Sequence, residues 1–240
     1  MRLDCYLVEN LLALTRTKAK DLIIENKVLV DGKIANKPSF EIIGHKVEII
    51  EQKQYVSRAA KKLKDFLDKH GFDLKNQTAI DVGSSTGGFV EVLLEYGVKK
   101  VVAVDVGKEQ LHQKLRDDKR VELHEETDIR EFKTSERFDI VTCDASFISL
   151  NNIIETIKKI SSRDIILLFK PQFEVGIKAK RDKKGVVTDQ NAIDGALNNF
   201  LTKCEILGLE LKAKEKSSLL GRDGNQEFIL YFRVDGDAKE

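Results

Sequence analysis

The sequence lacks the features that mark a secreted, metal-binding or membrane-embedded chain. Its three cysteines, Cys5, Cys143 and Cys204, lie far apart and give neither a metal-ligand spacing nor a disulfide framework. No run of 18 uninterrupted apolar residues occurs, and Asp4 and Glu9 interrupt the apolar N-terminus, which excludes a secretory signal and a membrane span. We therefore expect a cytoplasmic protein with no membrane partner.

An excess of charge of one sign is also missing, because 41 Lys and Arg nearly balance 40 Asp and Glu. Net charge alone therefore does not indicate a nucleic-acid partner, and a basic surface must come from segregation of charges. Two stretches show such segregation. Residues 52–64 carry basic side chains and no acidic one, and residues 178–184 oppose their basic side chains only with Asp182. Such runs are usually solvated surface, but the second also suits a clamp on RNA phosphates.

The 240 residues of the chain suffice for one ordinary domain plus a small one. The patterns along the sequence place the boundary near residue 55. Leu3, Leu7, Leu11 and Leu12 repeat at helical spacing, and Thr15 or Thr17 can cap a second helix. The stretches "KVLV" and "HKVEII" then follow a strand pattern, with a turn at Asp31-Gly32. We expect a small α+β domain over residues 1–54 and a larger domain over 55–240, with 55–60 as linker.

The small domain resembles the S4 RNA-binding domain in the segments "RLD", "TRTKAKDLI", "KVLVDGK" and "KPS". The composition of this part, with nearly as many acidic as basic residues, favours ordinary solvated charges, whereas the ordered match favours RNA. The resemblance implies RNA docking by Arg16, Lys18, Lys20 and Lys33.

The rest of the chain alternates strand and helix patterns, with apolar strands in "TAIDVG", "KKVVAVDVG", "RFDIVTCDA" and "RDIILLFKPQF". This alternation predicts an α/β fold, a Rossmann-like doubly wound sheet that is parallel at its centre. "EFILYF" is a late strand that we expect to run antiparallel. Ligands of such sheets bind beyond the carboxyl ends of the strands, where Asp81, Asp105, Asp144 and Lys170 are expected.

The turn "DVGSSTGGF" bears on the cofactor. It matches neither a dinucleotide fingerprint nor a phosphate loop, but Gly83 permits a sharp exit from the strand, and Gly87 and Gly88 permit close approach to a ligand. Asp105 follows at the end of the next strand, where a carboxylate can accept both hydrogen bonds of a ribose diol. The combination resembles S-adenosylmethionine-dependent methyltransferases and implies a cofactor set of Asp81, Gly83, Ser84, Gly87, Gly88, Phe89, Asp105, Thr127 and Asp128.

A helix is predicted between a Ser57 N-cap and a Gly71 stop. At 100° per residue its buried stripe contains Ala59, Leu63, Phe66, Leu67 and His70. Lys61 falls opposite this stripe, whereas Lys62 falls on its border and can lean toward a site.

Lys62, Asp144, Lys170 and Glu227 resemble the Lys-Asp-Lys-Glu set of FtsJ-like ribose 2′-O-methyltransferases. Together with "SRAAKKL", "DVGSSTGGF", "DASFISL", "FKPQFE" and "GNQEF", they resemble the TlyA, or haemolysin A, family of ribosomal RNA methyltransferases, from Arg2 to about residue 232. Family members said to modify both ribosomal subunits have short extra terminal segments, and this chain begins and stops earlier. The resemblance therefore implies the 23S rRNA of the large subunit more directly than 16S rRNA.

The resemblance implies methyl transfer from S-adenosylmethionine to the 2′-hydroxyl of a cytidine in ribosomal RNA within a subunit, with S-adenosylhomocysteine as product and no metal. Burial and a second ammonium group lower a lysine pKa, so Lys170 is the candidate base, with Asp144 and Glu227 orienting the amines. The further RNA contacts implied are Arg58, Lys61, Lys180, Arg181 and Lys183. A monomer is favoured, although the sequence does not fix the oligomeric state.

Three alternatives stay open at this point. The four site residues could form a structural ion-pair network. The protein could be a haemolysin or pore-forming protein, although it lacks a spanning segment and a strongly amphipathic lysine-rich helix. It could also be an RNA-binding factor that binds the cofactor without turnover.

Overall fold

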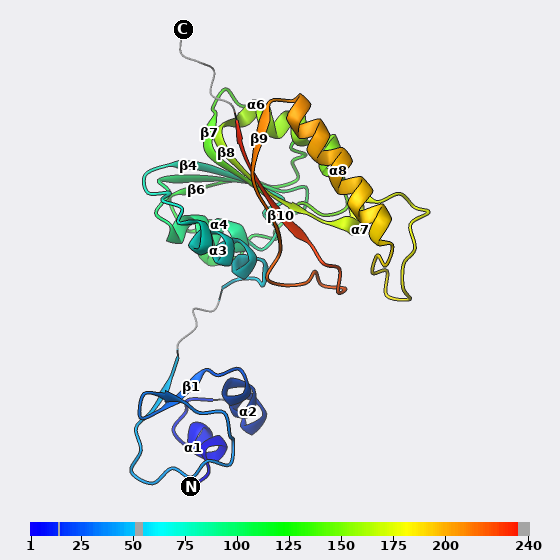
Figure 1. Ribbon diagram of the computed structural model, residues 1–240. Coiled ribbons are helices and arrows are strands. Elements are labelled where there is room, and N and C mark those ends of the chain that lie inside the picture. Colours follow the sequence, from blue (N-terminus) through cyan, green and yellow to red (C-terminus); the bar gives the residue numbers. More distant parts are fainter. Residues whose placement is uncertain (14, 51–54, 235–240) are drawn as a thin grey trace. The chain divides into compact units, whose positions relative to one another are not determined.

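A computed structural model describes residues 1–13, 15–50 and 55–234. Contacts within the chain divide it into two compact units, Met1–Gln54 and Tyr55–Glu240. Each unit has its own hydrophobic core, and each is described separately (Figure 1). Tyr55 and Val56 pack against the core of the larger unit.

The small unit packs two helices on a three-stranded antiparallel sheet. Its elements are α1 (Leu3–Glu9), α2 (Arg16–Ile24), β1 (Val28–Val30), β2 (Lys33–Ile34) and β3 (Val47–Ile49), with strand order β2-β1-β3. Thr15 caps α2, because its side chain accepts a hydrogen bond from the Lys18 amide, as predicted. The helical assignment of Leu11 was wrong, since it lies beyond α1 with a φ of 58° and is exposed.

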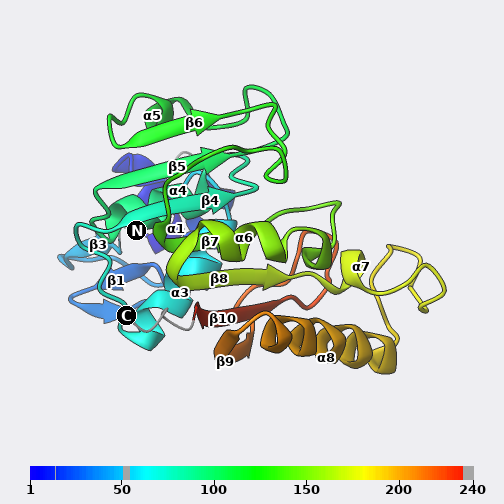
Figure 2. The same cartoon turned by 90° about the horizontal axis from the view of Figure 1, so that it is seen from above.

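The large unit is built on a sheet that is parallel at its centre, as predicted. The sheet has seven strands in the order β6-β5-β4-β7-β8-β10-β9 (Figure 2). Its strands are β4 (Thr78–Val82), β5 (Lys100–Val104), β6 (Val121–His124), β7 (Phe138–Cys143), β8 (Ser161–Phe169), β9 (Leu209–Lys216) and β10 (Phe228–Val234). The first five run parallel, and β10 runs antiparallel to both of its neighbours. The start of β10 therefore lies at the same edge as the ends of the parallel strands.

Helices cover both faces of this sheet (Figure 1). One face carries α3 (Ala59–His70), α4 (Gly88–Glu95) and α5 (Gln113–Arg116), and the other carries α6 (Ile154–Ile160) and α8 (Gln190–Ile206). The short elements η1 (Leu150–Asn152) and α7 (Pro171–Glu174) follow β7 and β8. Neither α8 nor β9 was predicted from the sequence. Among the helices in the described ranges, none has the length and apolarity needed to cross a membrane.

The predicted limits of α3 were half right. Gly71 ends the helix in the left-handed conformation that glycine adopts without strain. Ser57 is not the N-cap, because Arg58 occupies that position and no side chain caps the helix. The buried stripe is also shifted: Ala60 and Lys62 are buried, while Ala59 is half-buried and His70 is exposed.

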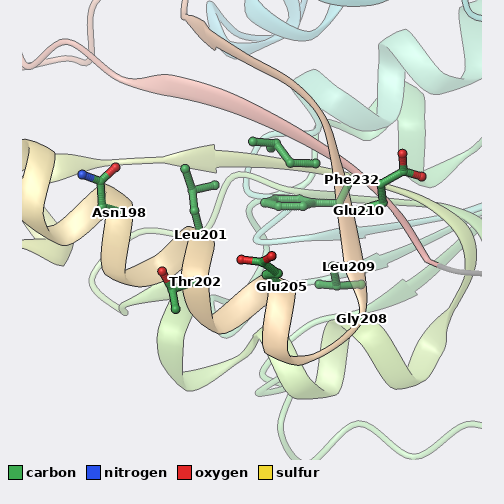
Figure 3. A pocket seen from close by; sticks show the side chains of 9 residues that line it. Asn198, Leu201, Thr202, Glu205, Gly208, Leu209, Glu210 and Phe232 are labelled. Atoms are coloured by element: carbon green, nitrogen blue, oxygen red, sulfur yellow. The ribbon is translucent and has the colours of Figure 1, made fainter.

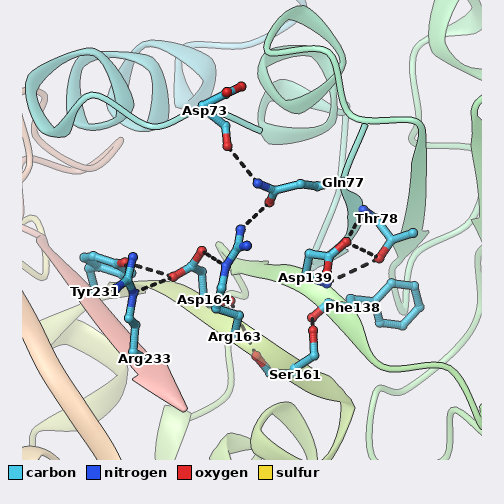
Figure 4. A network of polar contacts seen from close by, with 11 residues as sticks. Asp73, Gln77, Thr78, Phe138, Asp139, Ser161, Arg163, Asp164, Tyr231 and Arg233 are labelled. Carbon is cyan, nitrogen blue, oxygen red and sulfur yellow. Dashed lines mark hydrogen bonds and ion pairs between the residues drawn. The ribbon is translucent and has the colours of Figure 1, made fainter. Parts of the chain in front are cut away.

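A polar network links β8 and β10 at the edge of the sheet opposite the ends of the parallel strands (Figure 4). Asp164, on β8, is buried and accepts hydrogen bonds from the Tyr231 hydroxyl (2.8 Å) and from Nε of Arg163 (2.8 Å) and Arg233 (3.3 Å). Burial and this carboxylate raise the pKa of Tyr231. Because Tyr231 and Arg233 lie on β10, the network fixes β10 against β8.

Candidate active site

The site lies along the sheet edge where the parallel strands end. Asp105 follows β5, Asp144 follows β7 and Lys170 follows β8. Glu227 directly precedes β10, and because Phe228 pairs with Phe169 in the ladder, Glu227 and Lys170 are the next residues in the same register. The topology thus brings residues far apart in the sequence to one edge.

Two ion pairs form the centre of the site, each with a buried lysine. The Lys62 Nζ lies 2.5 Å from Glu227 Oε2, and the Lys170 Nζ lies 2.7 Å from Asp144 Oδ1. Lys62 and Lys170 are each 7% exposed, and Glu227 is 3% exposed. Buried charges are costly unless they are paired, so each lysine requires its carboxylate. The structure therefore joins the four predicted residues as two lysine–carboxylate pairs.

Lys170 makes two further contacts that the sequence analysis missed. Its Nζ donates to the backbone oxygen of Asp144 (3.0 Å) and to Ser146 Oγ (2.8 Å). Ser146 lies two residues after Asp144 in "DASFISL". Its place in that motif is the feature of the sequence that could have indicated a contact with Lys170. These contacts hold the lysine side chain above the end of β7.

The adjacent lysines of α3 have different environments, as predicted. Lys61 is exposed and pairs with Asp65 one turn later on the same helix. Lys62 is more deeply buried than a border position implies, because Glu227 neutralises its charge inside the protein. Arg58, at the start of α3, is exposed.

The glycines of "DVGSSTGGF" allow close contacts within the protein. A Cβ at Gly83, whose φ is +77°, would lie 2.7 Å from the Cα of Ala145. A Cβ at Gly87 would meet the side chains of Leu111 and Leu115, and one at Gly88 would meet Ser57 Oγ and the Ala60 amide. Gly87 and Gly88 thus allow close packing against these neighbouring residues of the protein. Phe89 is buried in the same core.

Asp105 is held rigidly at the end of β5. One of its carboxylate oxygens accepts a hydrogen bond from the Ser85 amide (2.8 Å) and the other from the Gly107 amide (2.7 Å). A carboxylate has about four acceptor positions, so two remain for a ligand. Thr127 is anchored beside it, since its amide donates to the Asp105 backbone oxygen. Asp128 is paired with Arg130, which lowers the pKa of its carboxyl.

Four buried side-chain atoms have no hydrogen-bond partner within the described part of the chain: Asp81 Oδ2, Ser84 Oγ, Asp144 Oδ1, which is ion-paired with Lys170, and Gln172 Oε1. Asp81 is 1% exposed, and only its other oxygen is bonded, to the Thr142 hydroxyl (2.7 Å). Burial, together with the charges of Asp144 and Asp105, raises the pKa of Asp81 to about 8. Since buried polar groups normally have partners, the atoms of Asp81 and Ser84 fit a bound polar ligand such as S-adenosylmethionine.

The basic residues expected to bind RNA are all exposed: Arg16, Lys18, Lys20, Lys33, Arg58, Lys61, Lys180, Arg181 and Lys183. Arg16 also has a structural contact, because its Nη2 lies 2.8 Å from the buried Asp4 carboxylate. We call residues 178–184 the basic loop. Asp182 orders its backbone, since the Asp182 Oδ1 accepts hydrogen bonds from the amides of Lys184 and Val186. The single acidic residue of this loop therefore shapes it and presents its basic side chains.

Other features of the described residues lie apart from this edge. No group of three or more His, Cys, Asp or Glu residues in the described ranges is placed to hold a metal ion. A groove of about 550 Å³ runs between α8 and β9, and side chains such as Leu201, Glu205 and Phe232 line it (Figure 3). None of the residues that line this groove is a predicted site residue.

Comparisons with known proteins identify the families that both parts of the chain resemble. Residues 55–234 match the FtsJ-like methyltransferase family, and residues 1–42 match the S4 domain. The 23S rRNA (cytidine-2′-O)-methyltransferase TlyA of Campylobacter jejuni is 44% identical over 253 residues, which covers 97% of this chain and 99% of that protein. The 16S/23S rRNA (cytidine-2′-O)-methyltransferase TlyA of Mycobacterium tuberculosis is 36% identical over 244 residues, with 98% and 91% covered.

A solved structure gives the same result at the level of the fold. A proposed hemolysin from Streptococcus thermophilus matches with a TM-score of 0.72 and 32% sequence identity, covering 98% of this chain and 89% of that one. The predicted methyltransferase fold and the N-terminal S4 domain are therefore both confirmed.

Proposed function

The chain belongs to the TlyA family of FtsJ-like methyltransferases, and from this premise we propose that it methylates the 2′-hydroxyl of a cytidine in ribosomal RNA. The observation that carries the proposal is the pair of buried lysine–carboxylate contacts, Lys62–Glu227 and Lys170–Asp144, at the ligand-binding edge of the sheet. The 44% identical relative is named for this reaction on 23S rRNA, which supports the large subunit as the target. A 36% identical relative is named for both rRNAs, so 16S rRNA is the second candidate.

S-adenosylmethionine, when bound, supplies an activated methyl group on a sulfonium. Asp105 would hold the ribose diol with its free acceptor positions, and Thr127 and Asp128 would border the adenine. Asp81 and Ser84 would use their unpartnered polar atoms toward the same ligand. These residues bind and orient the cofactor, and the basic residues place the RNA.

The reaction needs a proton acceptor, because a ribose hydroxyl is a weak acid and a weak nucleophile. We assign this role to Lys170, which must have released its own proton to act as a neutral amine. The Asp144 carboxylate, the Asp144 backbone oxygen and Ser146 orient its nitrogen. Lys62 and Glu227 would steady the charge that develops as the proton leaves the hydroxyl. The scheme uses positioning and proton transfer by the protein's own side chains.

RNA recognition is assigned to two basic surfaces. In the S4 unit, Lys18, Lys20 and Lys33 are exposed, and Arg16 keeps 55% of its side chain exposed despite the pair with Asp4. In the large unit the exposed loop that contains Lys180, Arg181 and Lys183 follows the helix after Lys170. Both surfaces suit phosphate contacts, which position RNA without reading its sequence.

The decisive experiment measures transfer of a labelled methyl group from S-adenosylmethionine to 23S rRNA, 16S rRNA, isolated subunits and assembled ribosomes, followed by mapping of the 2′-O-methylated nucleotide. Transfer to a cytidine of 23S rRNA is expected. Binding of both cofactor and RNA without any transfer would instead favour a non-catalytic RNA-binding factor.

Substitution at position 170 tests the assigned base. Lys170→Arg should be as inactive as Lys170→Ala, because a guanidinium does not release its proton at working pH, while cofactor affinity stays unchanged. An active Lys170→Arg enzyme would show that position 170 supplies charge only.

A further inference from the structure

Two loops of the site are joined along their length. The first, residues 144–150, follows β7, and the second, residues 170–174, follows β8 and contains α7. At the near end Lys170 bonds to Asp144 and Ser146, and in the middle the rings of Phe147 and Phe173 have centroids 5.2 Å apart. We call this arrangement the two-loop clamp.

Glu174 closes the far end of the two-loop clamp. Its Oε2 accepts a hydrogen bond from the Ser149 hydroxyl (2.6 Å), and its Oε1 accepts one from the Leu150 amide (2.8 Å). Leu150 is 2% exposed and belongs to the core under the sheet, so this end is fixed to a rigid part of the protein. Glu174 itself is half-buried, which strengthens hydrogen bonds to its carboxylate relative to those on the surface.

The loop after β8 contains little regular structure of its own. The helix α7 has only four residues, and a single turn is not stable by itself in water. In the first loop Phe147 is 92% exposed and has a φ of 64°, while Ala145, Ile148 and Leu150 pack on the core. Glu174 supplies the contacts at the far end of the two loops, whereas the contacts of Lys170 with Asp144 and Ser146 hold the near end and one ring contact holds the middle.

We propose that Glu174 is a positioning residue that fixes Lys170 against Asp144 by tying the loop after β8 to the loop after β7. The inference rests on the proposed function, since it assigns Glu174 a role in the same methyl transfer. A carboxylate that bridges two loops at their far end sets the geometry at the near end, and small misplacements of reacting groups lower rates strongly.

The test compares Glu174→Ala, Glu174→Gln and Ser149→Ala in the full chain with the unchanged protein. Glu136→Ala is the matched control. Glu136 is an exposed carboxylate that pairs with Lys100, and it precedes β7, at the opposite end of that strand from Asp144. For each protein the measurements are kcat and KM for RNA methylation, the pH–rate profile, cofactor affinity by calorimetry and the folded fraction.

Glu174→Ala should lower kcat on the order of tenfold to a hundredfold, with KM and cofactor affinity within about twofold of the unchanged protein. The midpoint of the pH–rate limb should also move, because the Lys170–Asp144 pair is less well held. Glu174→Gln should recover part of the rate, since its amide oxygen can still accept a hydrogen bond from the Leu150 amide. Ser149→Ala removes one of the two hydrogen bonds to Glu174, so its kcat should lie between those of Glu174→Ala and the unchanged protein. It serves as the test if Glu174→Ala does not fold.

The outcomes separate the two proposals. An unchanged protein that transfers no methyl group overturns the proposed function itself. If the unchanged protein is active, the inference fails when Glu174→Ala keeps its kcat, or when its rate falls only in proportion to the folded fraction with the pH–rate limb unmoved.

Discussion

At the scale of single residues, Lys61 and Lys62 provide the sharpest comparison in the site. They share a helix and a charge, but Lys61 pairs with Asp65 at the surface, while Lys62 is buried against Glu227. Lys62→Ala leaves a buried carboxylate without its partner and should lower turnover by on the order of a hundredfold or more, with cofactor binding retained. Lys61→Ala should change turnover little beyond a modest loss of RNA affinity. Equal losses in steady-state assays of the two variants would contradict the assignment of Lys62.

Asp105 gives a test of the cofactor site. Backbone amides already fix both of its carboxylate oxygens. The side chain therefore needs no further ordering to accept hydrogen bonds from a ligand. Asp105→Ala should weaken S-adenosylmethionine binding by roughly 1.5–3 kcal/mol, the range for hydrogen bonds to a charged group. Asp117→Ala, at an exposed position after α5, is the control. Unchanged affinity of the Asp105 variant in calorimetry would remove Asp105 from the cofactor site.

Asp81 makes stability depend on pH in a definite direction. Its pKa is raised from 3.8 to about 8 in the folded protein, so between these values the folded state keeps a proton that the unfolded chain has released. The free energy of unfolding should therefore fall as the pH rises from about 4 to 8. Asp81→Asn removes this dependence and should gain stability relative to the unchanged protein at pH 8. Urea unfolding without cofactor at pH 5 and pH 8 measures the difference, and parallel curves would refute the burial argument.

The candidate site was accessible from sequence only in part. Spacing on a helix placed Lys62 at the border of the buried stripe, but its burial depends on Glu227, which lies 165 residues later. Local periodicity carries no information about such a partner. The resemblance to a family supplied the four residues, whereas their division into two ion pairs and the contact with Ser146 required the folded chain.

At the scale of elements, the packing of α4 on α3 depends on Gly88. A Cβ there would lie 2.9 Å from the backbone nitrogen of Ala60, and backbone cannot move as a side chain can. Gly88→Ala should therefore lower the free energy of unfolding by about 1–3 kcal/mol, as overpacking does. Gly195→Ala is the matched control on α8, because a Cβ there meets nothing within 4 Å. It should raise stability by about 0.5–1 kcal/mol through helix propensity.

Chemical denaturation of both glycine variants decides this prediction. Equal stability of the Gly88 and Gly195 variants would mean that α3 and α4 are not packed as described. Since α3 carries Lys62, a loosened contact should also lower turnover in the Gly88 variant alone.

Two elements, β9 and α8, were not predicted from the sequence. In β9 only Leu209 is buried, because this strand lies at the edge of the sheet and faces solvent along most of its length, so its apolar signal is weak. For α8 the signal was present, since Ile193, Leu197, Phe200 and Cys204 are buried at helical spacing. The antiparallel β10 was predicted from "EFILYF" and confirmed by its ladders with β8 and β9.

At the scale of the whole molecule, the chain consists of two units with separate cores and separate chemistry. The core of the small unit contains Leu3, Leu7 and Ile23, and its polar centre is Asp4 between Arg2 and Arg16. The residues proposed for cofactor and catalysis all belong to the large unit. Cofactor binding and most of the RNA affinity should therefore be separable by truncation.

Removal of residues 1–54 should leave a folded protein, because the large unit keeps its seven-stranded sheet and both of its core clusters. Circular dichroism and calorimetry should show native structure and unchanged S-adenosylmethionine affinity. RNA affinity should fall, and the dependence of log affinity on log salt should become shallower, since each lost phosphate contact reduces that slope by about 0.7–0.9. Methylation of rRNA should fall with the affinity. Full activity of the truncated protein on the same rRNA would show that the S4 unit is not needed for substrate recognition, which would assign the required RNA contacts to the large unit and its basic loop.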